Sequence, residues 1–136
     1  MAAVAYLPQA VPLRASGIDH VQIPVRSYRL AKGLYRAALA PLGYSLRLDW
    51  PDRTRAYFGA GDELSSLWLV QHVAAGPVEL ALAAPDRRAV DAFYAAALAA
   101  GASPRRDPGA YAELTAHAYG AAVADGDGNV IEAIAR

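Results

Sequence analysis

The chain has 136 residues, with 13 basic and 13 acidic side chains and no cysteine. This length predicts one domain with a substantial core, and the hydrophobic fraction of 55% argues against disorder. The balanced charge, without a basic block, argues against a nucleic-acid partner. The lack of cysteine excludes disulfides, thiolate zinc sites and cysteine nucleophiles.

The first fifteen residues are apolar but are interrupted by Pro8 and Pro12. They lack the positively charged start and the unbroken apolar run of a signal peptide. We interpret residues 1–15 as an N-terminal extension to a domain at 16–136. No apolar run reaches transmembrane length without charges or prolines, so we expect no membrane partner and a cytoplasmic location.

Residues 18–25 alternate between apolar and polar side chains. Val21, Ile23 and Val25 share one face, and His20 and Gln22 share the other. This period of two predicts a strand with one face on a core and one polar face.

The pattern after this strand predicts a helix and three strands, at 27–42, 44–50, 54–58 and 66–73. Ser27 is the expected N-cap of the helix. In the last strand, Trp68 and His72 lie opposite Leu67 and Leu69. Arg55 and Tyr57 share a face in the strand at 54–58.

The second half predicts a strand at 78–83, a helix at 86–101, and two strands at 117–124 and 129–135. We expect the last two strands to form a hairpin, closed by an Asx-stabilised turn at 125–129 rather than a calcium loop. Residues 103–113 are polar and rich in proline and glycine, which predicts either a loop or a loop that contains a short edge strand.

A shift of 59 positions aligns residues 34–39 with 93–98 and places His20 on Glu79. The order of elements repeats as well. We therefore predict two copies of one βαβββ unit, module one at 16–75 and module two at 76–136.

Glu132 lies within the apolar strand at 129–135. A carboxylate on such a strand is costly to desolvate unless it faces a cation, a metal or hydrogen-bond donors. Glu132 is therefore expected to face either solvent or a site.

Four stretches, DHVQIPV, LYRAALAPLGY, AAPDRRAVDAFYAAALAAGA and DGDGNVIEAI, resemble the vicinal oxygen chelate superfamily of glyoxalases, bleomycin-resistance proteins and extradiol dioxygenases. The resemblance implies an α+β fold in which two paired βαβββ modules form a curved mixed β-sheet cup with helices on its outer face. It also implies a homodimer and a small-molecule ligand.

The resemblance further implies a metal site on the first and last strands of each module. His20 and Glu132 match the family's ligands, and Glu79 replaces its usual histidine. The fourth position falls on or near Trp68, which cannot ligate. The implied cofactor is a divalent metal (Mn, Fe, Ni, Mg or Zn), or none.

Two interpretations remain open. The first is a metal-dependent enzyme with ligands His20, Glu79 and Glu132, in which Glu132 and Tyr119 act in catalysis. The second is a metal-free protein that binds a small molecule. The expected ligand-binding residues are Gln22, Arg55, Tyr57, Trp68 and His117, whereas His72 is more often a surface residue.

Overall fold

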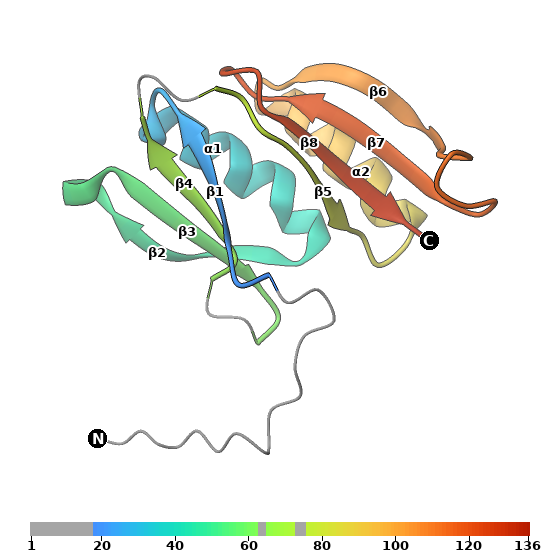
Figure 1. Ribbon diagram of the computed structural model, residues 1–136, viewed down its shortest axis with the longest axis horizontal. Helices are drawn as coiled ribbons and strands as arrows, with labels where there is room; N and C mark the ends of the chain where they lie inside the picture. The colour runs from blue at the N-terminus through green and yellow to red at the C-terminus, as the bar shows by residue number, and fades with distance from the viewer. Residues whose placement is uncertain (1–17, 63–64, 73–75) are drawn as a thin grey trace.

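The computed structural model describes residues 18–62, 65–72 and 76–136, which form two βαβββ units (Figure 1). The first contains β1 (Val21–Val25), α1 (Tyr28–Leu39), η3 (Ala40–Leu42), β2 (Tyr44–Trp50), η4 (Pro51–Arg53), β3 (Arg55–Ala60) and β4 (Leu67–Gln71). The second contains β5 (Glu79–Ala83), α2 (Arg87–Ala99), β6 (Ser103–Ala110), β7 (Tyr119–Ala124) and β8 (Val130–Ala135). The predicted α+β class and the two modules are confirmed. The predicted extension at 1–15 lies outside the described residues.

Each module forms a mixed sheet of four strands, in the orders β1-β4-β3-β2 and β5-β8-β7-β6. In both sheets the first strand pairs in parallel with the last. Gln22 pairs with Trp68, and Ala81 pairs with Glu132. Since the shift of 59 places Gln22 on Ala81, Trp68 and Glu132 occupy equivalent positions in the two modules.

Local signals set the ends of both helices. The Ser27 hydroxyl caps α1 by accepting from the N–H of Leu30, and the Asp86 carboxylate caps α2 in the same way. The predicted helix at 27–42 changes to the short η3 around Pro41 and stops at Gly43, whose φ of 90° favours glycine. No helix in the described ranges is long and apolar enough to cross a membrane.

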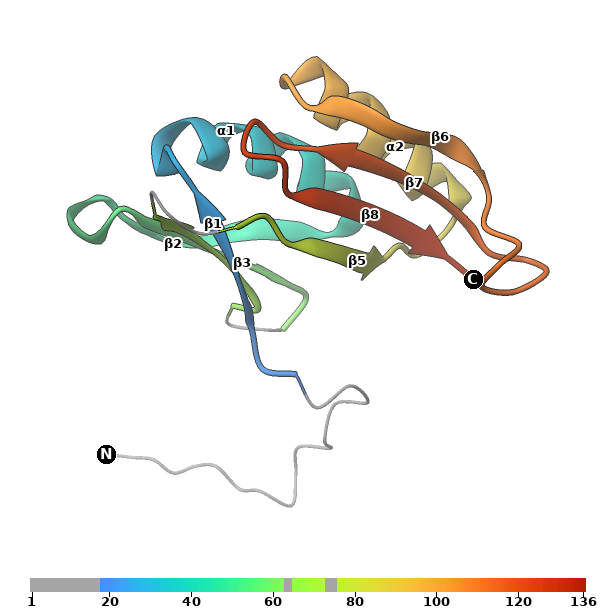
Figure 2. The same cartoon turned by 45° about the horizontal axis from the view of Figure 1, so that its top comes forward.

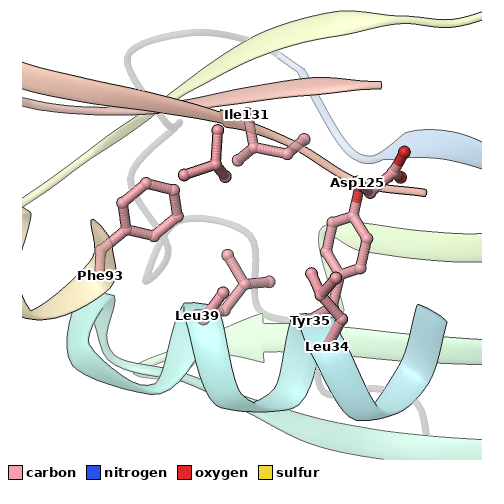
Figure 3. Close-up of a pocket in the computed structure, with 8 residues that line it drawn as sticks. Leu34, Tyr35, Leu39, Phe93, Asp125 and Ile131 are labelled. Carbon is pink, nitrogen blue, oxygen red and sulfur yellow. Dashed lines mark hydrogen bonds between the residues drawn. The ribbon is translucent and has the colours of Figure 1, made fainter. Parts of the chain in front are cut away.

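Both helices cover one side of the sheets, which is the predicted outer face of the cup, and share one core with them (Figure 2). Helix α1 contacts β2, β3 and β4 of the first sheet. Its other side faces the second module, where Leu39 points toward Phe93 of α2 and Ile131 of β8, and Tyr35 points toward Asp125 (Figure 3). A void of only ≈ 10 Å³ remains between them. The opposite faces of the two sheets are therefore both turned away from this core.

Strand β6 corrects the prediction for residues 103–113. Residues 103–110 form a strand of eight residues, five of which pair with β7, although Pro104 and Pro108 lie among the eight. This is possible because β6 is the edge of its sheet, so only one side of its backbone must supply hydrogen bonds. Register shifts on either side of Arg106 accommodate the irregular sequence.

The turn between β7 and β8 holds a buried carboxylate. Oδ1 of Asp125 accepts from the backbone N–H groups of Asp127 and Asn129, at 2.8 and 2.9 Å. Oδ2 accepts from the Tyr35 hydroxyl of α1 at 2.7 Å and from Nδ2 of Asn129 at 2.8 Å. These contacts confirm the predicted Asx-stabilised turn and link it to the first module.

Asn129 is fully buried and joins the two modules directly. Its Nδ2 donates to the carbonyl of Pro24 at the end of β1, at 2.8 Å. Its Oδ1 accepts from the N–H of Val78 before β5, also at 2.8 Å. The end of β1 and the beginning of β5 are thereby held together.

We expect Asn129→Asp to destabilise the fold by about 2–4 kcal/mol, because it removes a buried donor and places a second carboxylate beside Asp125. Urea unfolding measures the change. Gln22→Glu makes the same chemical change at an exposed position and should alter the free energy of unfolding by less than about 0.5 kcal/mol. Equal effects of the two substitutions would contradict this role of Asn129.

Candidate functional site

The side of the first sheet that faces away from α1 carries most of the predicted ligand-binding residues. Ile23 and Val25 of β1 are buried against the helices, so the alternate residues of β1 and their strand neighbours face outward. We call this surface the module-one face. It consists of Gln22, Leu48, Trp50, Arg55, Tyr57 and Trp68, with His20 beside it.

Three rings on the module-one face form a parallel stack. The His20 and Trp68 rings have centroids 3.7 Å apart and an interplanar angle of 7°. The Tyr57 and Trp68 rings are 4.4 Å apart at 11°. Because β4 lies between β1 and β3, His20 and Tyr57 cover opposite faces of the indole. The indole N–H donates to the Ser65 hydroxyl at 3.1 Å.

This stack changes how a flat ligand can bind. Both faces of Trp68 are already covered, so a ligand ring reaches the outer side of Tyr57 or displaces His20. The Leu48 and Trp50 side chains of β2, on the Tyr57 side, are 44% and 38% exposed. Among the described residues Arg55 has no carboxylate partner, so its guanidinium is available to an anion.

The corresponding face of the second sheet is largely closed by Tyr111. Its ring is 2% exposed and packs on Ile134 and Gly120. A Cβ atom at Gly120 would lie 3.0 Å from the Tyr111 ring and 2.6 Å from Ile134 Cδ1, so only glycine leaves this room. The Tyr111 hydroxyl donates to Oε2 of Glu132 at 3.3 Å.

Arg106 extends this contact outward. Its guanidinium lies 3.6 Å from the centroid of the Tyr111 ring and donates to Glu113 at 2.6 Å. Burial, together with the charge of Glu132, raises the pKa of Tyr111 to about 12. The hydrogen bond from Arg106 lowers the pKa of Glu113. Glu132 therefore faces a neutral phenol and a nearby cation rather than open solvent.

The three predicted metal ligands do not converge within one chain. The network around Asn129 holds the end of β1 beside the beginning of β5. His20 precedes Pro24 by four residues, roughly 13 Å of strand, whereas Glu79 directly follows Val78. His20 instead stacks on Trp68 and contacts Asp19 at 2.9 Å. Within the described ranges of one chain, no three His, Asp or Glu side chains are placed together where they could hold a metal ion.

The remaining predicted site residues lie apart from Glu132. Tyr119 faces the helices, where its hydroxyl donates to Asp91 of α2 at 2.6 Å. The guanidinium of Arg87 lies over its ring, 5.0 Å from the centroid. The predicted catalytic pair of Glu132 and Tyr119 is thus placed on opposite faces of the second sheet. His117 is exposed in the connection before β7, and His72 is exposed just after β4.

Comparison with known proteins identifies the family. The model of the Glyoxalase/Bleomycin resistance protein/Dioxygenase superfamily matches residues 17–133. The chain belongs to this superfamily. The resemblance inferred from the four sequence stretches is thereby confirmed, whereas a search of curated proteins gives no match.

Solved structures of the superfamily share the fold. A glyoxalase/bleomycin resistance protein from Albidiferax ferrireducens is 26% identical, with a TM-score of 0.77, over 87% of this chain and 98% of that one. A lactoylglutathione lyase from Agrobacterium tumefaciens is 18% identical, with a TM-score of 0.66, over 88% and 93%. A glyoxalase I mutant from Zea mays is 22% identical, with a TM-score of 0.63, over 85% of this chain and 45% of that one.

Sequence reasoning missed Tyr111 and Arg106. Both lie in or beside the stretch interpreted as a loop, and neither belongs to a strand or helix with a clear period. One signal was available, a tyrosine within the polar segment 103–113, since a large aromatic ring tends to be buried. Its partner Glu132 follows 21 residues later, so nothing in the local sequence identifies the pair.

We expect Tyr111→Phe to alter stability in a pH-dependent way. The pKa of Tyr111 is about 12 in the folded chain against a usual value of 10.0, so the contribution of the neutral phenol is complete below pH 10. It is lost as the pH rises toward 12, because the unfolded chain ionises first. The difference in unfolding free energy between wild type and Tyr111→Phe should therefore shrink over this interval. Parallel stability curves would contradict the assignment.

Proposed function

We propose that this protein binds a flat small molecule without a metal, at the module-one face. The observation that carries the proposal is the parallel stack of His20, Trp68 and Tyr57, which occupies the position where the family pattern expects a metal ligand. Aromatic rings provide a large contact area and favour parallel, offset neighbours. A flat ligand extends this stack on the Tyr57 side, next to Trp50.

The charged side chains on the module-one face indicate which charge the ligand carries. Arg55 lies on β3 two residues before Tyr57, on the same side of the sheet. Arg53 lies over the Trp50 ring at 4.8 Å and adds a second guanidinium at this edge. On module two, by contrast, Glu132 is engaged by Tyr111. We therefore propose an aromatic anion, held by stacking and by a charge-assisted contact with Arg55.

Tryptophan fluorescence tests this proposal. The chain has two tryptophans, so the variant Trp50→Phe leaves Trp68 as the single reporter. We expect aromatic carboxylates to change its emission with dissociation constants in the micromolar to low millimolar range, roughly 4–8 kcal/mol of binding. Arg55→Gln should weaken the binding of the anions by about tenfold and leave the binding of neutral aromatic compounds nearly unchanged.

Tyr57→Ala should abolish binding, because it removes the ring on which the ligand stacks. Tyr119→Phe is the control, since this tyrosine lies on the helix side of the second sheet. Binding that survives Tyr57→Ala, or that is lost equally in Tyr119→Phe, would contradict a site on the module-one face.

A second candidate function is a metal-dependent enzyme assembled by two copies of the chain. It is favoured by two equivalences between the modules: strand pairing places Glu132 where module one has Trp68, and the sequence shift of 59 places Glu79 where it has His20. The open faces of the two modules point away from a common core, so a cup enclosed between them needs a second copy. We propose a homodimer in which the module-one face of one copy covers the second sheet of the other.

Light scattering after size-exclusion chromatography tests the dimer, and elemental analysis of the same fractions separates the two functions. We expect a dimer that retains less than about one metal ion per ten chains after dialysis against Mn, Fe, Ni or Zn, since Trp68 stands at the position equivalent to Glu132 and cannot ligate. A near-stoichiometric metal that disappears in Glu132→Ala would instead support the enzyme. A monomer would overturn the proposed assembly.

A further inference from the structure

A groove of about 300 Å³ lies on the helix side of the molecule, away from both open sheet faces. It runs between the start of α1, the end of α2 and the turn that joins β7 to β8. Its walls are formed by Arg26, Ser27, Leu30, Ala31, Leu34, Ala100, Gly101 and the turn residues 125–127. None of the predicted site residues contributes to it.

The floor of the groove is apolar. Leu30 is 78% exposed, the largest exposed fraction among the large apolar side chains of the described residues. Ala31 and Leu34 continue the surface inward along α1. A branched apolar group of four carbons seated here would cover Leu30 and remove this surface from water.

The rim of the groove carries two opposite charges that form an ion pair without a hydrogen bond. Nε of Arg26 lies 3.8 Å from Oδ1 of Asp127, which is too long for a hydrogen bond. The Arg26 side chain is 84% exposed, whereas that of Asp127 is 19% exposed. A mostly buried carboxylate thus has only a loose ion pair as its charged partner, and the guanidinium remains free to bind a second anion.

The helix ends reinforce the same polarity. The groove receives the N-terminal end of α1 on the side of Arg26 and the C-terminal end of α2 at Ala100 and Gly101. Partial positive charge at the first end and partial negative charge at the second align with the two side chains. The groove therefore has a positive pole, a negative pole and an apolar floor.

We propose that this groove binds a small zwitterion, an α-amino acid with a branched apolar side chain. The ligand carboxylate pairs with Arg26, its ammonium pairs with Asp127, and its side chain lies on Leu30 and Leu34. An amine or a carboxylic acid alone satisfies only one pole and leaves the other charge facing it.

The site is coupled to the junction between the modules. Leu34 and Asp125 line both this groove and the small void beside Tyr35 (Figure 3). A ligand that packs on Leu34 also contacts the turn whose carboxylate accepts a hydrogen bond from the Tyr35 hydroxyl. Occupation of the groove thus favours the folded junction and raises the melting temperature of the protein.

Isothermal titration calorimetry with L-leucine tests the proposal on the full chain. We expect a dissociation constant in the range of about 0.1–10 mM, and binding at least about tenfold weaker for isocaproate and isoamylamine, which each lack one charge. Arg26→Gln and Asp127→Asn should each weaken the binding of leucine by about tenfold. Arg29→Gln is the matched control, because Arg29 is exposed on α1 outside the groove.

Amide chemical shifts locate the ligand independently of stability. Leucine should shift the signals of Gly101 and Gly126, which line the groove, and leave Gly59 on β3 unchanged. No heat and no shift at about 10 mM leucine would overturn the proposal. Equal binding of the amine or the acid, or full binding by both groove variants, would overturn it as well. None of these results bears on ligand binding at the module-one face.

Discussion

The arrangement of this molecule depends on one buried carboxylate and one buried amide. Asp125 accepts four hydrogen bonds, and Asn129 connects it to both β1 and the strand entry at Val78. A buried polar group that lacks a partner is costly, so each member of this network requires the others in place. Apolar packing alone would tolerate sliding between alanine-rich helices, whereas these directional bonds specify one relative position of the modules.

That position decides where binding surfaces can form. Because α1 packs on the first sheet and α2 on the second, the helix-facing sides of both sheets are buried in the core and their other faces point away from it. The start of β1 and the start of β5 lie at opposite ends of the junction, so residues that are equivalent by sequence are distant within one chain. His20 and Glu79 illustrate this point. A sequence repeat predicts equivalence between modules, but the pairing geometry decides whether equivalent residues meet.

Short-range patterns predicted the strands, the helices and their caps, because periods of two and 3.6 residues and side chains such as Ser27 and Asp86 act locally. The length of β6 was underestimated because its prolines disfavour a central strand but are tolerated at an edge, and edge position is a property of the whole sheet. The faces on which Arg55, Tyr57 and Trp68 lie were predicted from the alternation of side chains along their strands. The contact of Tyr111 with Glu132 did not, because it depends on how the connection before β7 folds back and on the missing side chain of Gly120.

The two modules differ in chemistry at one position that is equivalent in their strand pairing. Module one places an indole there and covers both of its faces with rings from neighbouring strands. Module two places a carboxylate there and satisfies it with a phenol whose own ionisation is suppressed by burial. A ring stack offers contact area without charge, and a carboxylate offers charge with little area. A scaffold of two equivalent modules therefore holds two unlike surfaces, an aromatic one with the Arg55 guanidinium beside Tyr57 and a carboxylate-bearing one closed by Tyr111.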